Sequence, residues 1–122
     1  MRHVSLAVVV LSLLVAACAA GSGSGDSGPR RNPNLITNAE LIELTDVDTA
    51  FDAIRRLHPN WLTGRGGSPA RVFVDGMDMG STDILRNYRV NQVEEVRFVS
   101  PSDAPMRFGT GFGGGVIEVI TR

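Results

Sequence analysis

The stretch FGTGFGGGVIEVIT, residues 108–121, decides the fold of this chain. Its first half is crowded with glycines, which adopt backbone angles that residues with a Cβ atom disfavour. Its second half alternates, so that Ile117 and Val119 lie on the face opposite Val116, Glu118 and Ile120, as in a β-strand. We therefore expect a glycine-rich turn that leads into a last strand over residues 116–121.

The same glycines contain the spacing G-x-G-x-x-G, at Gly109, Gly111 and Gly114. In dinucleotide-binding folds a strand precedes this motif and a helix follows it, because the helix N-terminus faces the pyrophosphate. Here the strand follows the glycines, so the pattern argues against nucleotide binding, and we expect no cofactor. Gly109 is instead well placed to end a short helix that begins at Ser102 or Asp103.

Two further strands are predicted upstream of the glycines. Residues 71–75 (RVFVD) and residues 95–99 (EVRFV) are rich in β-branched and aromatic side chains. The pair Asp75 and Gly76 is a hairpin turn signal, with a brief return strand over residues 77–79. Together with residues 116–121, these segments predict an α+β fold with a small mixed β-sheet of about three to four strands and short helices.

The helices are predicted from capping residues and apolar spacing. Thr37 and Glu40 have the spacing of a capping box, which predicts a first short helix. Apolar residues recur on one helical face in residues 49–59 (TAFDAIRRLHP), which predicts a second helix. Asn91 is a candidate cap for a further helical turn over residues 92–95.

The composition narrows the classes of function. Arginine supplies all 12 basic residues, against 13 acidic ones, for a net charge of −1. No basic patch of the size that nucleic acid requires is visible, so we expect no nucleic-acid partner. Beyond the N-terminal segment the one histidine is His58, at a predicted helix end, and Asp75, Asp78 and Asp83 do not follow the ligand pattern of a calcium loop. We expect neither an enzyme nor a metal site.

The N-terminal segment has the features of an export signal. A short basic start is followed by an apolar run too short to span a bilayer comfortably, which predicts a signal peptide over residues 1–17. The residues LVAAC before and at Cys18 resemble the lipobox of bacterial lipoproteins, and that resemblance implies lipidation of Cys18. An ordinary signal peptide with an incidental cysteine is the alternative. Residues 18–34 are rich in Gly, Ser and Pro, which predicts a flexible tether before one domain at residues 35–122.

The folded part as a whole resembles the plug domain of TonB-dependent outer-membrane receptors. The resemblance rests on the strand that ends in Val74-Asp75-Gly76, on the segment 93–98, on Phe108-Gly109, and on the final GGVIEVIT of residues 114–121. In fold terms it implies a plug-like domain, with Asp75, Gly76, Gly109, Gly114 and Gly115 as fold-motif residues. It does not carry over transport activity, because receptors continue into a membrane barrel and we find no segment typical of a TonB-binding box. Since Ala19 is not the aspartate of inner-membrane retention signals, lipoprotein sorting by resemblance implies the periplasmic face of the outer membrane.

Two hypotheses about function follow. The first is an interaction module that is anchored to the membrane through Cys18 and associates with an outer-membrane barrel or receptor protein. Its partner would contact one sheet face, which is predicted to carry Arg97, Val99, Val116, Glu118 and Ile120; the alternative is that this face packs on the chain's own loops. The second hypothesis is a small-ligand binder, for a siderophore or nutrient-like compound, with a pocket between residues 63–69 and 100–115.

Overall fold

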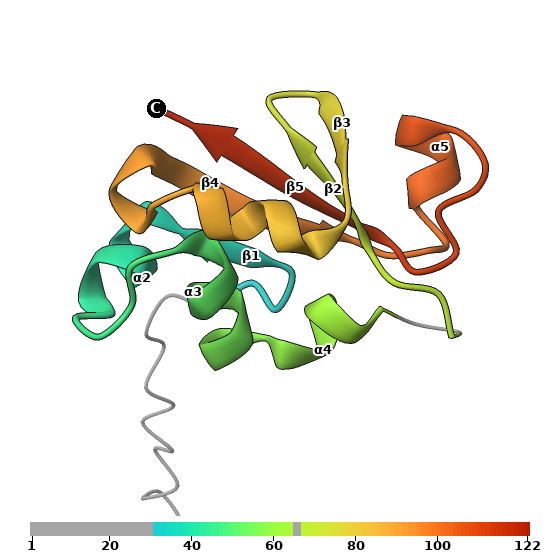
Figure 1. Cartoon of the computed structure of the whole chain (residues 1–122). Coiled ribbons are helices and arrows are strands. Elements are labelled where there is room, and N and C mark those ends of the chain that lie inside the picture. The colour runs from blue at the N-terminus through green and yellow to red at the C-terminus, as the bar shows by residue number, and fades with distance from the viewer. Residues whose placement is uncertain (1–30, 65–66) are drawn as a thin grey trace, which may run out of the picture. The chain divides into compact units, whose positions relative to one another are not determined.

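The computed structural model describes residues 31–64 and 67–122. The predicted signal peptide, Cys18 and the tether up to residue 30 lie outside the described residues. The domain is an α+β fold built on one five-stranded sheet, with the strand order β1-β4-β5-β2-β3 (Figure 1). The sheet consists of β1 (Leu35–Thr37), β2 (Arg71–Val74), β3 (Met77–Gly80), β4 (Val93–Val99) and β5 (Val116–Thr121).

The sheet is mixed, as expected for this fold class. β2 and β5 run parallel, whereas the β1–β4, β4–β5 and β2–β3 pairs are antiparallel. The glycine-rich stretch therefore does lead into a strand, and that strand lies at the centre of the sheet, hydrogen-bonded on both sides. The strand β1 was not predicted from the sequence, because three residues are too few to show an alternating pattern.

Three of the helices lie where the sequence predicts them, whereas the short helix over residues 59–63 was not predicted and begins where the second helix was expected to end. The helices are α2 (Asn38–Glu43), α3 (Ala50–Leu57), α4 (Pro59–Thr63) and α5 (Ala104–Phe108), with the 3₁₀ helices η1 (Thr82–Asn87) and η2 (Val90–Gln92). The Thr37 hydroxyl caps α2 and the Thr49 hydroxyl caps α3. The turn predicted over residues 92–95 with Asn91 as its cap is wrong: Asn91 lies inside η2, and β4 begins at Val93 because pairing with β5 overrides the weak local preference.

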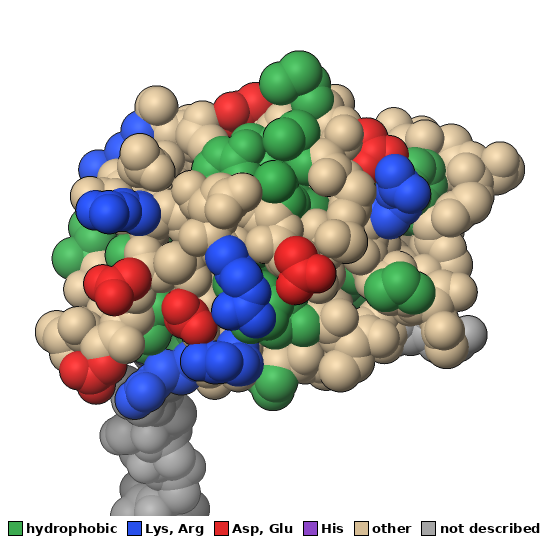
Figure 2. Space-filling view, in the orientation of Figure 1, with side chains coloured by type: hydrophobic (Ala, Val, Ile, Leu, Met, Phe, Trp, Pro, Cys, Tyr) green, Lys and Arg blue, Asp and Glu red, His purple; other side chains and the backbone are tan. Residues whose placement is uncertain are grey.

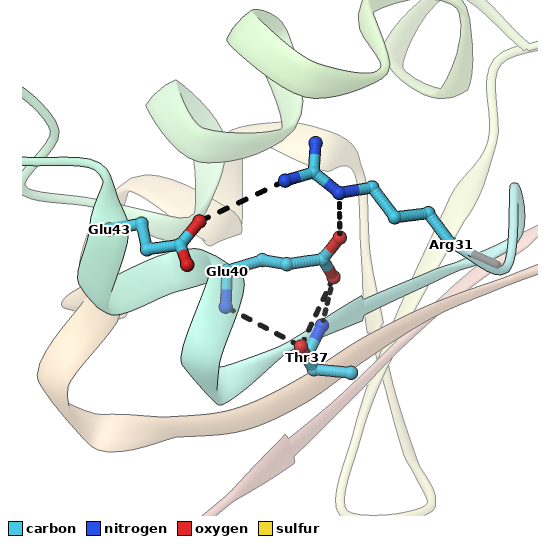
Figure 3. Close-up of polar contacts among 4 residues, drawn as sticks. All are labelled: Arg31, Thr37, Glu40 and Glu43. Carbon is cyan, nitrogen blue, oxygen red and sulfur yellow. Dashed lines mark hydrogen bonds and ion pairs between the residues drawn. The ribbon is translucent and has the colours of Figure 1, made fainter. Parts of the chain in front are cut away.

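The capping box at the start of α2 also holds the first described residue (Figure 3). The Thr37 amide donates to the Glu40 carboxylate at 2.9 Å, and the Glu40 amide donates to the Thr37 hydroxyl at 3.4 Å. The free oxygen of Glu40 lies 3.4 Å from Nε of Arg31, and Glu43 lies 3.9 Å from the same guanidinium. Arg31 therefore joins the N-terminal edge of the domain to α2.

The main hydrophobic core lies on one face of the sheet, beneath α2, α3, α4 and η1. Leu41, Ile54, Trp61 and Leu85 come from these helices and pack on the strands. The strands contribute a second set of fully buried side chains to this core, among them Ile36, Val72, Val93, Val96, Ile117 and Val119. An irregularity in β4 between Val93 and Glu95 lets both Val93 and Val96 face this core. A second, smaller cluster lies on the opposite face, beneath α5.

Candidate functional site

The five residues of the predicted partner surface lie on one face of the central strands β4 and β5. Arg97 lies opposite Glu118 in the register, Val99 lies opposite Val116, and Ile120 lies opposite Glu95. This is the face that points away from the main core, and we call it the second face. The alternation read from the sequence therefore assigned these side chains to a common side of the sheet.

The structure corrects the expectation that all five are available to a partner. Val99 is 5% exposed and Val116 is fully buried, because α5 and the glycine-rich segment fold back over them. Their neighbours in this cluster include Phe73 from β2 and Ala104 from α5. The chain itself covers this end of the second face, as the alternative interpretation held, and Val99 and Val116 are not accessible in this structure.

The open part of the second face is formed by Glu95, Arg97, Glu118 and Ile120, each of them partly exposed. Arg97 donates to Glu95 at 2.8 Å along the same strand. Glu118 pairs at 3.1 Å with Arg107 of α5, and its side chain is only 13% exposed as a result. Ion pairs near the surface stabilise a domain only modestly, so the main effect of these two pairs is to set the charge pattern of this face.

Arg107 and Glu95 were missed in the sequence analysis. Arg107 lies eleven positions before Glu118, and only the return of the chain through the glycines brings the two side chains together. Glu95 lies two positions before Arg97 on the same strand, but their pairing depends on rotamers that no sequence pattern records.

At both edges of the sheet, some outward backbone amides donate to the chain's own groups. At β1 the Leu35 amide donates to the Asn32 carbonyl at 3.1 Å and the Thr37 amide donates to Glu40. At β3 the Gly80 amide donates to the Asp78 carboxylate at 2.9 Å. Because edge strands recruit other chains through unpaired backbone groups, these bonds reduce the number of groups that an added strand could use.

Two of the fold-motif residues, Asp75 and Gly76, lie beside the C-terminal end of β5. Asp75 has a positive φ of 49° and forms the hairpin turn with Gly76, whose φ is 84°. Its carboxylate accepts hydrogen bonds from the Thr121 amide at 3.0 Å and from the Thr121 hydroxyl at 2.7 Å. These bonds lower the pKa of Asp75 below its usual value, with the Thr121 hydroxyl as the larger cause. The Val-Asp-Gly turn thus fastens the end of the last strand.

The bond between Asp75 and Thr121 predicts a pH-dependent effect. Because the folded state lowers the pKa of Asp75, the bond stabilises the domain above about pH 4 and this contribution is lost as the carboxylate becomes protonated at lower pH. We expect Asp75→Asn, which tolerates the positive φ, to lower the urea midpoint at pH 7. At pH 3 the gap between variant and wild type should narrow. An equal gap at both pH values would contradict the charge-assisted bond.

The remaining motif glycines have two different structural roles. Gly109 ends α5 with a φ of 89°, and its amide donates to the Pro105 carbonyl at 3.2 Å. At Gly114 there is no room for a side chain, since a Cβ atom would overlap the carbonyl oxygens of Ser68 and Pro69. Gly115 combines a φ of 86° with the Phe98 ring only 2.7 Å from where its Cβ would lie. The glycines are therefore needed for backbone shape and for close packing.

The two loops predicted to frame a ligand pocket touch each other. Gly114 lies directly against the backbone carbonyls of Ser68 and Pro69, and Gly113 lies beside the Ser68 side chain. A shallow depression of about 280 Å³ lies elsewhere, where segment 100–115 borders β1 and β4. Its polar lining comes from Asn32, Asn34, Arg97, Asp103 and Arg107.

His58 has a packing role between α3 and α4. Its amide donates to the Ile54 carbonyl at 2.7 Å, which ends α3, and its ring stacks on Trp61 with 4.3 Å between ring centroids. Burial lowers the pKa of His58 below 6.5, and the nearby Glu40 charge opposes this in part. No nucleophile that His58 could activate is identified in the sequence analysis. In the described part of the chain, no group of three or more His, Cys, Asp or Glu side chains is arranged as a metal-ligand set.

The lowered pKa of His58 sets the sign of a second pH effect. The folded state disfavours the imidazolium, so below about pH 6.5 it binds fewer protons than the unfolded state does. The free energy of unfolding should therefore fall as the pH drops through about 6.5. We expect His58→Gln to flatten the stability profile between about pH 8 and pH 5.5. Urea titrations at several pH values measure this slope. A slope that is the same in both proteins would show that His58 does not cause it.

On the face shown in Figure 2, acidic and basic side chains are interspersed, and no large region carries a single sign of charge. Hydrophobic side chains gather there around the β2–β3 hairpin, where Met77 and Met79 are exposed. Within residues 31–64 and 67–122, no helix combines the length and apolar composition needed to cross a bilayer. Comparison with protein-family models, with curated proteins and with solved structures finds no match for the chain.

Proposed function

We propose that this chain is an exported lipoprotein, anchored through Cys18 at the periplasmic face of the outer membrane, whose domain binds a barrel or receptor protein of that membrane. The lipobox-like residues before Cys18 and the plug-like motifs of residues 74–76 and 114–121 support the proposal. The proposed role is non-enzymatic: the domain recognises a protein surface and catalyses no reaction.

The open part of the second face is the observation that carries the proposal. Arg97 and Glu95 lie on β4, and Ile120 lies on β5, and each of these two central strands is hydrogen-bonded to a neighbour on both sides. Such strands hold their side chains in fixed positions, which favours specific recognition. Charges of both signs beside an apolar side chain are also typical of interfaces between proteins that exist separately.

The length of the tether restricts where the partner lies. Arg31, which is fixed to α2, follows Cys18 by 13 residues. A fully extended chain spans at most about 3.6 Å per residue, so the domain's N-terminal edge stays within ~47 Å of a lipid on Cys18. A partner that the anchored domain can reach is therefore a membrane protein or lies close to the membrane surface.

Co-purification from detergent-solubilised outer membranes tests the proposal. We expect tagged full-length chain to recover a membrane partner, and we expect Cys18→Ser to lose both the lipid and the partner. Arg97→Glu and Ile120→Asp should keep the lipid and the fold but lose the partner. Ile42→Asp is the matched control, since Ile42 is 64% exposed on α2, away from the second face. Recovery of lipidated protein alone, as a monomer, would count against the proposal.

A small-ligand binder is the second candidate. The depression favours it, because two arginines from different elements, Arg97 and Arg107, line one hollow together with Asn32 and Asn34. Such groups bind carboxylates. A thermal-shift screen of acidic nutrients should raise the melting temperature of wild type and not of Arg97→Gln. If no compound stabilises the wild-type chain, this candidate fails.

A further inference from the structure

The cover on the second face is held by a small number of side chains. We call residues 103–113 the cover segment. Within α5, only Ala104 is fully buried against the second face, while Phe108 and Phe112 are partly buried and pack on the same cluster. The Phe73 ring lies 4.5 Å from the Phe108 ring and 5.6 Å from the Phe112 ring, measured between centroids. The aromatic side chains of the cover segment thus pack on side chains of β2, β4 and β5.

The hydrophobic cluster beneath the cover segment is separate from the main core. The main cluster lies on the other face of the sheet and contains sixteen buried residues, none of them from the cover segment. The backbone around Gly109 and Gly111 is loosely surrounded, because a Cβ atom at either position would find no other atom within 4 Å. Segments with few buried contacts open locally at a lower free energy than the whole domain. We therefore expect the cover segment to open at a lower free energy than the main core.

The surface beneath the cover segment has a distinct chemistry. Phe73, Val99 and Val116 form an apolar patch across three strands. Glu118 borders the patch, and its carboxylate is neutralised by Arg107 of the cover segment. A segment that fills this site therefore supplies aromatic side chains together with a basic group, as the cover segment does.

We propose that the patch of Phe73, Val99 and Val116, bordered by Glu118, is a docking site for a partner protein's segment that carries aromatic side chains and an arginine or lysine. The cover segment occupies this site in the partner-free chain and leaves it when the partner binds. This inference rests on the proposed function, since it takes the partner to be a protein. It adds the chemistry that the partner presents and the step that exposes the site.

If the cover segment must open before the partner binds, the apparent affinity for the partner is lower than the intrinsic affinity. When only a small fraction of molecules has the site open, the apparent dissociation constant is the intrinsic one divided by that fraction. Changes that loosen the cover segment raise the open fraction, and they strengthen binding by the same factor. A merely structural cover predicts the opposite, because its loosening would only destabilise the chain.

A peptide in trans tests the proposal. The probe is a fluorescent peptide with the sequence of residues 103–113 (DAPMRFGTGFG), added to the full chain in detergent and followed by anisotropy. We expect Phe112→Ser to bind this peptide at least tenfold more tightly than wild type does. The double variant Phe108→Ser with Phe112→Ser should bind it more tightly still. Trp61 fluorescence reports whether the main core of each variant remains folded.

Two controls define the chemistry of the site. A peptide in which glutamate replaces the arginine should bind at least tenfold more weakly to the Phe112→Ser chain. Glu118→Gln in the same background should reduce the preference for the arginine peptide. Binding that is no tighter to the folded variants than to wild type, or that ignores both charge changes, would overturn the proposal.

Hydrogen exchange on the unmodified full chain gives an independent readout, which also covers the case in which the serine variants do not fold. We expect the amides of residues 104–112 to exchange much faster than those of residues 117–119, although both lie in ordered parts of the domain. Exchange of both segments at one common rate would mean that the cover opens only by global unfolding, and the proposal would be wrong. Failure of these tests leaves the co-purification result untouched, because the open part of the second face could still hold the partner.

Discussion

We expect Gly114→Val to abolish the folded domain. A Cβ atom at this position would overlap two backbone carbonyl oxygens, of Ser68 and Pro69, and backbone atoms cannot move aside as a flexible side chain can. Gly115→Val adds a second conflict, since φ is 86° and the Phe98 ring lies 2.7 Å from the added atom. Valine is among the residues that this region of backbone angles excludes most strongly. Circular dichroism and urea titration should show little or no cooperative unfolding.

Gly113 provides the matched control for this prediction. Its φ is not positive, and a Cβ atom there would lie 3.6 Å from the Ser68 hydroxyl, which is an ordinary contact distance. Gly113→Ala should therefore change the free energy of unfolding by no more than a typical surface substitution does, about 0.5 kcal/mol. A stable, cooperative Gly114→Val protein would mean that Ser68 and Pro69 do not pack on Gly114 as described.

Trp61→Ala should have the second largest effect, a loss of about 3–5 kcal/mol in the free energy of unfolding. Trp61 is 2% exposed and is the largest fully buried side chain of the domain. It stacks between His58, at 4.3 Å, and Phe98 of β4, at 5.5 Å between centroids. Its removal leaves a cavity where α4 meets the sheet. Because a domain of this size has only about 5–15 kcal/mol of stability, the variant should be largely unfolded at moderate urea.

Trp61→Phe is the informative companion variant. It keeps an aromatic ring between His58 and Phe98, so it should recover more than half of the stability that alanine loses. Ile42→Ala, at an exposed site on α2, should change the midpoint little. If Trp61→Ala and Ile42→Ala destabilise the chain to the same extent, the assignment of Trp61 to the core is wrong.

Local signals predicted a large part of this fold. The alternation of residues 116–121 placed Ile117 and Val119 in the main core and Glu118 on the other face. The capping box at Thr37 and the hairpin at Asp75-Gly76 were predicted for the same reason. In each case the determining interactions join residues within four positions of each other, so the sequence records them directly.

Other features could not be predicted, because they depend on contacts between distant residues. β1 forms only because Ile36 pairs with Val96 of the neighbouring strand, sixty positions away in the sequence. Asp75 and Thr121 are also far apart in the chain, and only the parallel pairing of β2 with β5 brings the turn to the end of the last strand. Bringing such distant residues together costs chain entropy, and the assembled sheet, not local preference, compensates for that cost.

The sequence by itself determined that residues 108–121 turn through glycines and end in a strand whose two faces differ. It also determined which side chains share the second face, because side-chain direction in a strand follows from position alone. Only the tertiary structure decided which of those side chains a partner can reach. Val99 and Val116 are buried because α5 returns over them, and that return rests on contacts of Phe108 and Phe112 with Phe73, more than thirty positions away, which no local pattern records.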